Sequence, residues 1–316
     1  MNARASLIAL AIALTVMAVI LYLLDWHAVI ATWARVIWPW VVAAAIVNIA
    51  NSWVEGLRWR TVLGASDVAV SASTTFWAML VGTVGNVVLP FKLGEAARAW
   101  AVARMAKAPM STVASTVVLD RLVDVAALVI LLIVIPAIVG PVAGVTLPSP
   151  RTLLIAVGGG FLLLAIAAAW WRRIRLRRKS SGAGGFGPHV ESFVRGLNAL
   201  RQHHFLAQAI AWAICSWCTR VAVVWVMLQA FGLDWSIMRA AMSLLIINLS
   251  IAVVGTPGNV GTFELAAAGA LRLFGATPEV AMSFAVILHL AEVMPTALLG
   301  ALAIWKFGLR LQRPDQ

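Results

Sequence analysis

Two apolar stretches of the chain are interrupted near their centres, by NVVLPFKLGE at residues 86–95 and by VGTPGNVGTFE at residues 254–264. In both, a proline and a glycine stand four residues apart and a carboxylate follows. Neither half of either stretch is long enough to cross roughly 30 Å of hydrocarbon comfortably. We therefore predict that residues 73–104 and residues 242–273 each form a re-entrant hairpin, which leaves the membrane on the side it entered.

The chain as a whole has the composition of a membrane protein. Hydrophobic residues make up 62% of the 316 residues and charged residues 11%, with a mean hydropathy of +0.96. Soluble domains are about 45 to 50% apolar and about 25% charged. The first apolar segment is not followed by a small-residue cleavage site, which favours an uncleaved helix over a signal peptide. Six segments approach or exceed the roughly 20 residues of a transmembrane helix, at 6–24, 38–54, 113–135, 152–171, 205–231 and 280–303.

Basic residues predict the orientation. They cluster at residues 171–179 and near the C-terminus, and such clusters stay on the cytoplasmic side of a membrane. If residues 73–89 crossed the bilayer, the basic segment 172–201 would face outside. All clusters become cytoplasmic when the first hairpin enters from the cytoplasm and the second from the opposite side. We therefore expect a multi-pass bacterial inner-membrane protein with both termini in the cytoplasm.

This arrangement is an inverted repeat, because the order span, span, hairpin, span occurs twice with opposite orientation. Broken helices at corresponding positions of two halves indicate a transport site near the membrane midplane. The alternative is a structural bundle with ordinary proline-kinked helices. The predicted divisions are a first half at 1–136, a linking loop and fourth span at 137–171, a basic cytoplasmic connector at 172–205, and the rest of the second half at 206–316.

Half of the twelve carboxylates lie in or against apolar segments. An isolated charge near the bilayer centre costs about 3 kcal/mol, so these groups are expected to be paired, neutral or hydrated. The six residues are Glu55, Glu95, Asp120, Asp124, Glu264 and Glu292.

Asp120 and Asp124 lie one helical turn apart and repel each other unless a cation sits between them. We expect Arg98 or Lys92 to supply that cation from the first hairpin.

Two more polar pairs stand at helical spacing, Glu55 with Arg58 and His289 with Glu292. The second pair suits a proton relay or a polar contact to the second hairpin, although an intramembrane histidine can also be a hydrogen-bonded packing residue.

No pattern in the sequence indicates catalysis. Cys215 and Cys218 lie in an apolar span without further metal ligands, and we interpret them as small core residues. Metalloprotease, hydrolase-elbow and Walker motifs do not occur in the sequence, so we expect neither an enzyme nor a bound metal or cofactor. The net charge of +12 is explained by topology signals and by attraction to anionic lipids, so nucleic-acid binding is not expected.

Four short motifs together resemble the transmembrane, flippase-like region of lysylphosphatidylglycerol synthases, over nearly the whole chain. Lys92 stands where arginine is more frequent in this family, and Asp120 where glutamate is usual. The motif residues are Arg58 and Trp59, then Asn86, Pro90, Lys92, Gly94, Glu95 and Arg98, then Asp120, Arg121 and Asp124, and finally Pro257, Gly258, Gly261 and Glu264.

The resemblance implies a role in translocating lipids such as aminoacylated phospholipids, hopanoids or polyprenyl-linked sugars. We interpret the chain as a free-standing member without the aminoacyl-transfer domain, and so as transporter-like. The head group is assigned to Asn86, Lys92, Arg98 and Arg121. Charge balance or proton coupling is assigned to Glu95, Asp120, Asp124, Glu264, His289 and Glu292. The hairpin tips are assigned to Pro90, Gly94, Pro257, Gly258 and Gly261.

Two other functions remain open at this point. One is a non-transporting accessory subunit of an envelope-lipid pathway, in which ion pairs only lock the hairpins. The other is a membrane-embedded glycosyl or lipid transferase, which would need an acceptor domain or a metal-binding carboxylate cluster. Both a monomer and a homodimer are compatible with a large lipid-facing surface.

Overall fold

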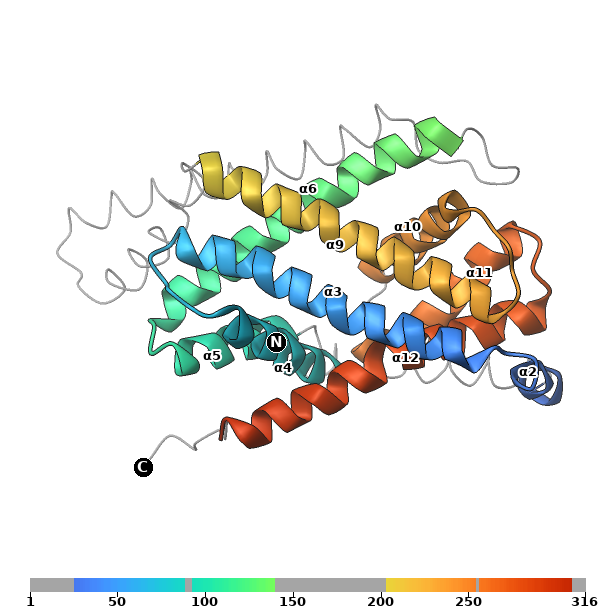
Figure 1. The fold of residues 1–316 in the computed structure, drawn as a ribbon, viewed down its shortest axis with the longest axis horizontal. Coiled ribbons are helices and arrows are strands. Elements are labelled where there is room, and N and C mark those ends of the chain that lie inside the picture. The colour runs from blue at the N-terminus through green and yellow to red at the C-terminus, as the bar shows by residue number, and fades with distance from the viewer. Residues whose placement is uncertain (1–25, 89–92, 140–202, 254–255, 309–316) are drawn as a thin grey trace, which may run out of the picture.

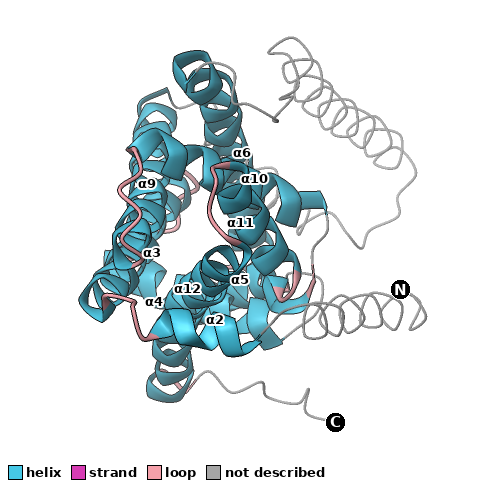
Figure 2. Cartoon of the chain, turned by 90° about the vertical axis from the view of Figure 1, so that its right-hand side faces the viewer, coloured by secondary structure: helices cyan, strands magenta, loops and turns pink. Residues whose placement is uncertain are grey.

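The structure is a computed structural model that describes residues 26–88, 93–139, 203–253 and 256–308. All regular elements within these ranges are helices, as Figure 2 shows, which confirms the predicted all-α class. They are α2 (Trp26–Trp33), α3 (Trp38–Gly64), α4 (Ala72–Val88), α5 (Gly94–Met105), α6 (Met110–Val139), α9 (His203–Ala230), α10 (Ile237–Val253), the short 3-10 helix η2 (Pro257–Asn259), α11 (Thr262–Leu273) and α12 (Pro278–Lys306).

Three helices of this part of the chain, α3, α9 and α12, are long and apolar enough to cross a membrane. A helix of 27 residues such as α3 is about 40 Å long, more than the hydrocarbon thickness. These helices contain the predicted spans 38–54, 205–231 (to within one residue) and 280–303, and the 30-residue α6 contains the predicted span 113–135. The predicted spans 6–24 and 152–171 lie outside the described residues, so the six-span inverted repeat stays a prediction.

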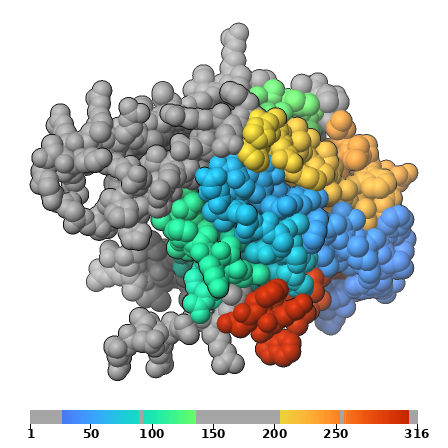
Figure 3. All heavy atoms as spheres, turned by 60° about the vertical axis from the view of Figure 1, so that its left-hand side comes forward, coloured from blue at the N-terminus to red at the C-terminus, as the bar shows by residue number. Residues whose placement is uncertain are grey.

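The long helices form the frame of the molecule. α3 and α9 run side by side, while α6 and α12 cross them (Figure 1). The face shown in Figure 3 exposes parts of α9 in yellow, α3 in blue and α12 in red. Many of their outward side chains are apolar, for example Val42, Ile46 and Leu298. This distribution is that of a helical bundle surrounded by lipid.

The first interrupted stretch folds as two helices, α4 and α5, that pack against each other. Their close approach requires glycine. A Cβ atom on Gly94 would lie 2.0 Å from the carbonyl oxygen of Gly82, and one on Gly85 would lie 2.7 Å from the Cα atom of Gly94. Gly94 is therefore a packing residue at the start of α5. Pro90 and Lys92 of the predicted tip lie outside the described residues.

The second interrupted stretch also folds as two packed helices, α10 and α11, with η2 at the turn. Gly258 and Gly261 have positive φ angles of 61° and 82°, a conformation that glycine adopts without strain. The backbone N–H of Gly261 donates to Oε2 of Glu264 at 2.7 Å. Glu264 thus caps the helix that it belongs to.

The two hairpins meet, because η2 packs against α4. α4 in turn packs against α12, where a Cβ atom on Gly300 would lie 2.2 Å from the carbonyl oxygen of Leu80. The first hairpin, α12 and the tip of the second hairpin therefore share one contact region, and the candidate site lies there.

Candidate functional site

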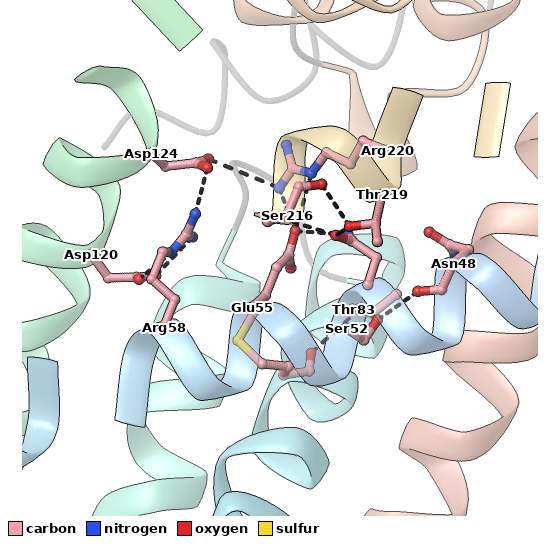
Figure 4. Close-up of polar contacts among 12 residues, drawn as sticks. Asn48, Ser52, Glu55, Arg58, Thr83, Asp120, Asp124, Ser216, Thr219 and Arg220 are labelled. Carbon is pink, nitrogen blue, oxygen red and sulfur yellow. Dashed lines mark hydrogen bonds and ion pairs between the residues drawn. The ribbon is translucent and has the colours of Figure 1, made fainter. Parts of the chain in front are cut away.

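A buried arginine joins the two aspartates of α6. Nε of Arg58 lies 2.7 Å from Oδ1 of Asp120, and its Nη1 lies 2.6 Å from Oδ1 of Asp124 (Figure 4). Arg58 is 1% exposed and Asp120 is fully buried. The predicted cation between the two aspartates exists, but it comes from α3. The expectation that Arg98 or Lys92 bridges the pair is wrong for Arg98, whereas Lys92 lies outside the described residues.

Arg98 of α5 instead joins the first hairpin to one end of this cluster. Its Nη2 lies 3.1 Å from Oδ2 of Asp120 and 2.6 Å from Oε2 of Glu95. Its guanidinium also lies 4.7 Å from the ring centroid of Trp59. Arg98 is 1% exposed, so all of its donors face protein groups. Asn86 closes the same hairpin, since its Oδ1 accepts from the Gly94 N–H at 3.0 Å.

Arg220 of α9 extends the cluster on the other side and was not predicted from the sequence. It forms an ion pair with Glu55, and its Nη2 lies 3.9 Å from Oδ2 of Asp124 (Figure 4). The expected partner of Glu55, Arg58, is engaged with the aspartates instead. A signal was present, because Arg220 is the only basic residue between positions 205 and 231. A lone charge in an apolar span indicates a buried partner.

Arg121 completes the cluster and is its most accessible member. It pairs with Glu95 and lies 3.5 Å from Oδ2 of Asp124, yet its side chain is 44% exposed. We call the whole set the charge network. It joins four arginines to four carboxylates across α3, α5, α6 and α9, and its members are Arg58, Arg98, Arg121, Arg220, Glu55, Glu95, Asp120 and Asp124.

Two polar cavities adjoin the charge network. The larger, of about 460 Å³, is lined by Asn86, Glu95 and Arg121 together with residues of the second hairpin tip. The smaller, of about 300 Å³, is lined by residues of the long helices and of both hairpins. The two cavities share three wall residues, which are Thr83, Asn259 and Val293. They therefore adjoin each other where the two hairpins meet.

The tip of the second hairpin is held by His289 of α12. Nδ1 of this histidine lies 2.6 Å from Oε1 of Glu264, and Nε2 lies 3.0 Å from the carbonyl oxygen of Gly258. Phe263 stacks on the imidazole with ring centroids 4.4 Å apart. The structure thus brings together the predicted residues His289, Glu264 and Gly258.

Glu292 lies one turn along α12 from His289 and lines the smaller cavity. Its backbone oxygen accepts from Nδ2 of Asn48 at 2.8 Å. Within the described ranges its carboxylate forms no ion pair. This residue is therefore the one predicted site carboxylate that faces a cavity without a charged partner among the residues that the structure describes.

Among the described residues, no group of three or more histidine, cysteine, aspartate or glutamate side chains is placed to hold a metal ion. Cys215 and Cys218 are free thiols and both are exposed. The interpretation of these cysteines as core residues is wrong, because they lie on the outer side of α9. A three-residue spacing places two residues on one helix face but does not tell which way the face points.

These features define an all-helical membrane protein in which two broken helices meet beside a buried charge network. The family model described as lysylphosphatidylglycerol synthase TM region matches residues 6–300, so the chain belongs to this family of lipid-handling membrane domains. The predicted resemblance is thereby confirmed. No curated protein and no solved structure matches the chain.

Proposed function

We propose that this protein moves a lipid or lipid-linked molecule with an anionic head group between the leaflets of the bacterial inner membrane, without covalent chemistry. The observation that carries the proposal is the larger cavity, because it is lined by the one well-exposed arginine of the charge network. Family membership supports a lipid substrate.

Arg121 is the residue that we assign to the head group. Its guanidinium borders a cavity of about 460 Å³, within the range of roughly 300 to 1,000 Å³ found for small-molecule sites. A phosphate that enters this cavity can replace Glu95 as the partner of Arg121, and arginine binds phosphate through two parallel hydrogen bonds. Asn86 lines the same cavity and offers an amide group.

Arg58 and Arg98 have a different role in this proposal. Both are enclosed, and each already binds Asp120. We assign to them the joining of α3, α5 and α6, so that Arg121 and Glu95 are held at the cavity wall.

The proposed topology is the six-span inverted repeat, with the first hairpin entering from the cytoplasm, the second from the opposite side, and both termini cytoplasmic. The head group would pass through the polar region where the hairpin tips meet, while the acyl or prenyl tails stay in lipid. Two observations support this path: η2 packs against α4, and the two cavities share a wall.

The test is leaflet translocation in proteoliposomes with labelled anionic phospholipids and polyprenyl phosphates. We expect Arg121→Gln to lower the rate at least tenfold without lowering the unfolding temperature, because Arg121 is partly exposed. Asp67→Asn is the matched control, since Asp67 is an exposed residue between α3 and α4 that lines neither cavity.

The rival function is an accessory subunit in which the charge network only locks the helices. In that case no lipid is moved although a control transporter is active in the same vesicles. Charge-removing variants would then lower only the yield of folded protein.

A further inference from the structure

We propose that His289 and Glu264 together bind one dissociable proton, and that this proton latches the tip of the second hairpin to α12. The coupling ion of the transport cycle would then be H⁺. The coupling rests on the proposed function, whereas the latch itself does not.

The latch consists of two contacts made by one imidazole ring. Nε2 of His289 faces the carbonyl oxygen of Gly258 at 3.0 Å, and Nδ1 faces Oε1 of Glu264 at 2.6 Å. The other carboxylate oxygen of Glu264 accepts from the Gly261 N–H. Through these contacts α12 holds both η2 and the start of α11.

The hydrogens that these two contacts require are the basis for proposing a bound proton. A carbonyl oxygen can only accept, so Nε2 must carry a hydrogen. The contact between Nδ1 and the carboxylate requires a second hydrogen. A neutral imidazole beside an ionised carboxylate supplies one hydrogen for two contacts. The pair therefore holds one extra proton, either as imidazolium with carboxylate or as imidazole with carboxylic acid, and its net charge is zero.

Loss of this proton breaks the latch. When the proton leaves to water in the smaller cavity, the pair takes a charge of −1 and one hydrogen remains for two acceptors. Either Gly258 or Glu264 must then lose its bond to His289. Since buried acceptors without donors are costly, the tip is expected to move until water reaches them. Binding of a proton from water restores both bonds.

Among the described residues at the smaller cavity, only the His289–Glu264 pair and Glu292 are left to titrate. Around the smaller cavity, α3 contributes Glu55 and α9 contributes Arg220, and these two pair with each other. The residues that α4 and α10 contribute to this cavity carry no ionisable side chain. Glu292 of α12 lines the same cavity one helical turn from His289, and its carboxylate can accept the departing proton.

The position of the tip links the latch to the path of the head group. Gly258 lines the larger cavity, and Asn259 lines both cavities. A tip released from α12 therefore changes the wall between the two cavities. The latch would close the passage when protonated and open it when deprotonated.

The latch can be tested without transport, by hydrogen exchange and mass spectrometry on the protein in lipid nanodiscs. We compare the amides of residues 256–264 with those of residues 94–105 from about pH 5 to about pH 9, a range in which histidine changes charge. After correction for intrinsic exchange, we expect tip protection to fall roughly ten- to a hundred-fold as the pH rises, which corresponds to the loss of one charge-assisted hydrogen bond. Protection of the first hairpin should stay constant.

Two variants separate the latch from ordinary destabilisation. In Glu264→Gln, the amide NH2 donates to Nδ1 and the amide oxygen accepts from Gly261, so both contacts are made without the extra proton. This variant should keep the tip protected at every pH. His289→Ala should leave it unprotected at every pH, and Asp67→Asn should behave as the native protein. The latch would be overturned if protection of the tip depended on pH in Glu264→Gln, or if it did not depend on pH in the native protein.

Coupling is tested separately in proteoliposomes with an imposed pH gradient. We expect the direction of the gradient to change the native translocation rate several-fold and to have no effect in Glu264→Gln. If the native translocation rate did not depend on the pH gradient, the coupling would be refuted while the proposed function stands. A pH-dependent tip in a protein that moves no lipid would instead refute the proposed function and leave the latch intact.

Discussion

The two hairpins are built alike but are held in different ways. The first is fixed by close glycine packing within α4 and α5 and by Arg98, whose guanidinium binds Asp120 and Glu95. The second is fixed at its tip by the two ring contacts of His289. Arginine remains charged under all physiological conditions, whereas histidine changes its charge near neutrality. The first hairpin is therefore attached permanently and the second conditionally, so motion is expected in the second.

Removal of Arg58 is expected to have the largest effect on the permanently attached part of the molecule. In Arg58→Ala, Asp120 loses its closest partner and Asp124 loses its contact with α3. We expect a loss of about 3 to 5 kcal/mol in the free energy of unfolding, because two buried carboxylates lose the closest partner of each. Unfolding in detergent micelles measures this change. The double variant Arg58→Ala with Asp124→Asn should recover part of it, and strictly additive effects would show that the two residues do not interact.

Glycine packing offers a direct comparison of the hairpins. Gly94→Ala places a methyl group 2.0 Å from a backbone oxygen and should cost about 1 to 3 kcal/mol, as overpacking does. Gly269→Ala in α11 is the matched control, because a Cβ atom there meets nothing within 4 Å. Since alanine favours helix more than glycine, we expect the control to be neutral or to stabilise by up to about 1 kcal/mol. Equal losses in the two variants would contradict the close packing of α4 on α5.

The interface between α3 and α9 is also expected to be permanently attached, like the first hairpin. Oδ1 of Asn51 accepts from the hydroxyl groups of Ser216 and Thr219, and Nδ2 donates to Glu55. Asn51→Ala removes the partner of these groups. We expect it to lower the free energy of unfolding, measured by thermal unfolding, by about 1 to 3 kcal/mol. Its effect should not depend on pH between about 5 and about 9, unlike that of His289→Ala. If the stability lost in Asn51→Ala depended on pH, the interface between α3 and α9 would be conditionally attached, like the second hairpin.

The smallest effect is expected at the thiols. Cys215→Ser with Cys218→Ser changes two exposed side chains on the outer side of α9 and should alter stability by no more than about 0.5 kcal/mol per residue. The same double variant provides a cysteine-free background for labelling the second hairpin tip. A large loss would mean that this side of α9 is covered by another part of the protein or by a partner.

Several features of the fold could be predicted because they depend on local sequence. Proline and glycine in the middle of apolar stretches indicated the hairpins, and apolar segments indicated α3, α6, α9 and α12. The carboxylates in these segments indicated a buried network, because isolated charges in lipid are costly. The confirmed family resemblance rested on four motifs, one in each hairpin and the others in the segments of α3 and α6.

The partners within the network could not be predicted in the same way. Arg58 stands three residues after Glu55, and helical spacing therefore suggested a pair. The structure instead points Arg58 at Asp120 and Asp124 of α6, and Arg220 of α9 takes Glu55. Such choices depend on which helices adjoin and how each is rotated about its axis, and both are set by packing across the whole bundle. The outward position of Cys215 and Cys218 depends on the same rotation.

The equal number of positive and negative groups in the charge network has a consequence for bioenergetics. Moving one elementary charge through a membrane potential of 100 mV involves about 2.3 kcal/mol. A body that carries four arginines and four carboxylates transfers no net charge when it moves, so the electrical part of the proton-motive force exerts no net pull on it. Voltage would act on the cargo and on the proton shared by His289 and Glu264, while the charge network itself adds no net charge movement.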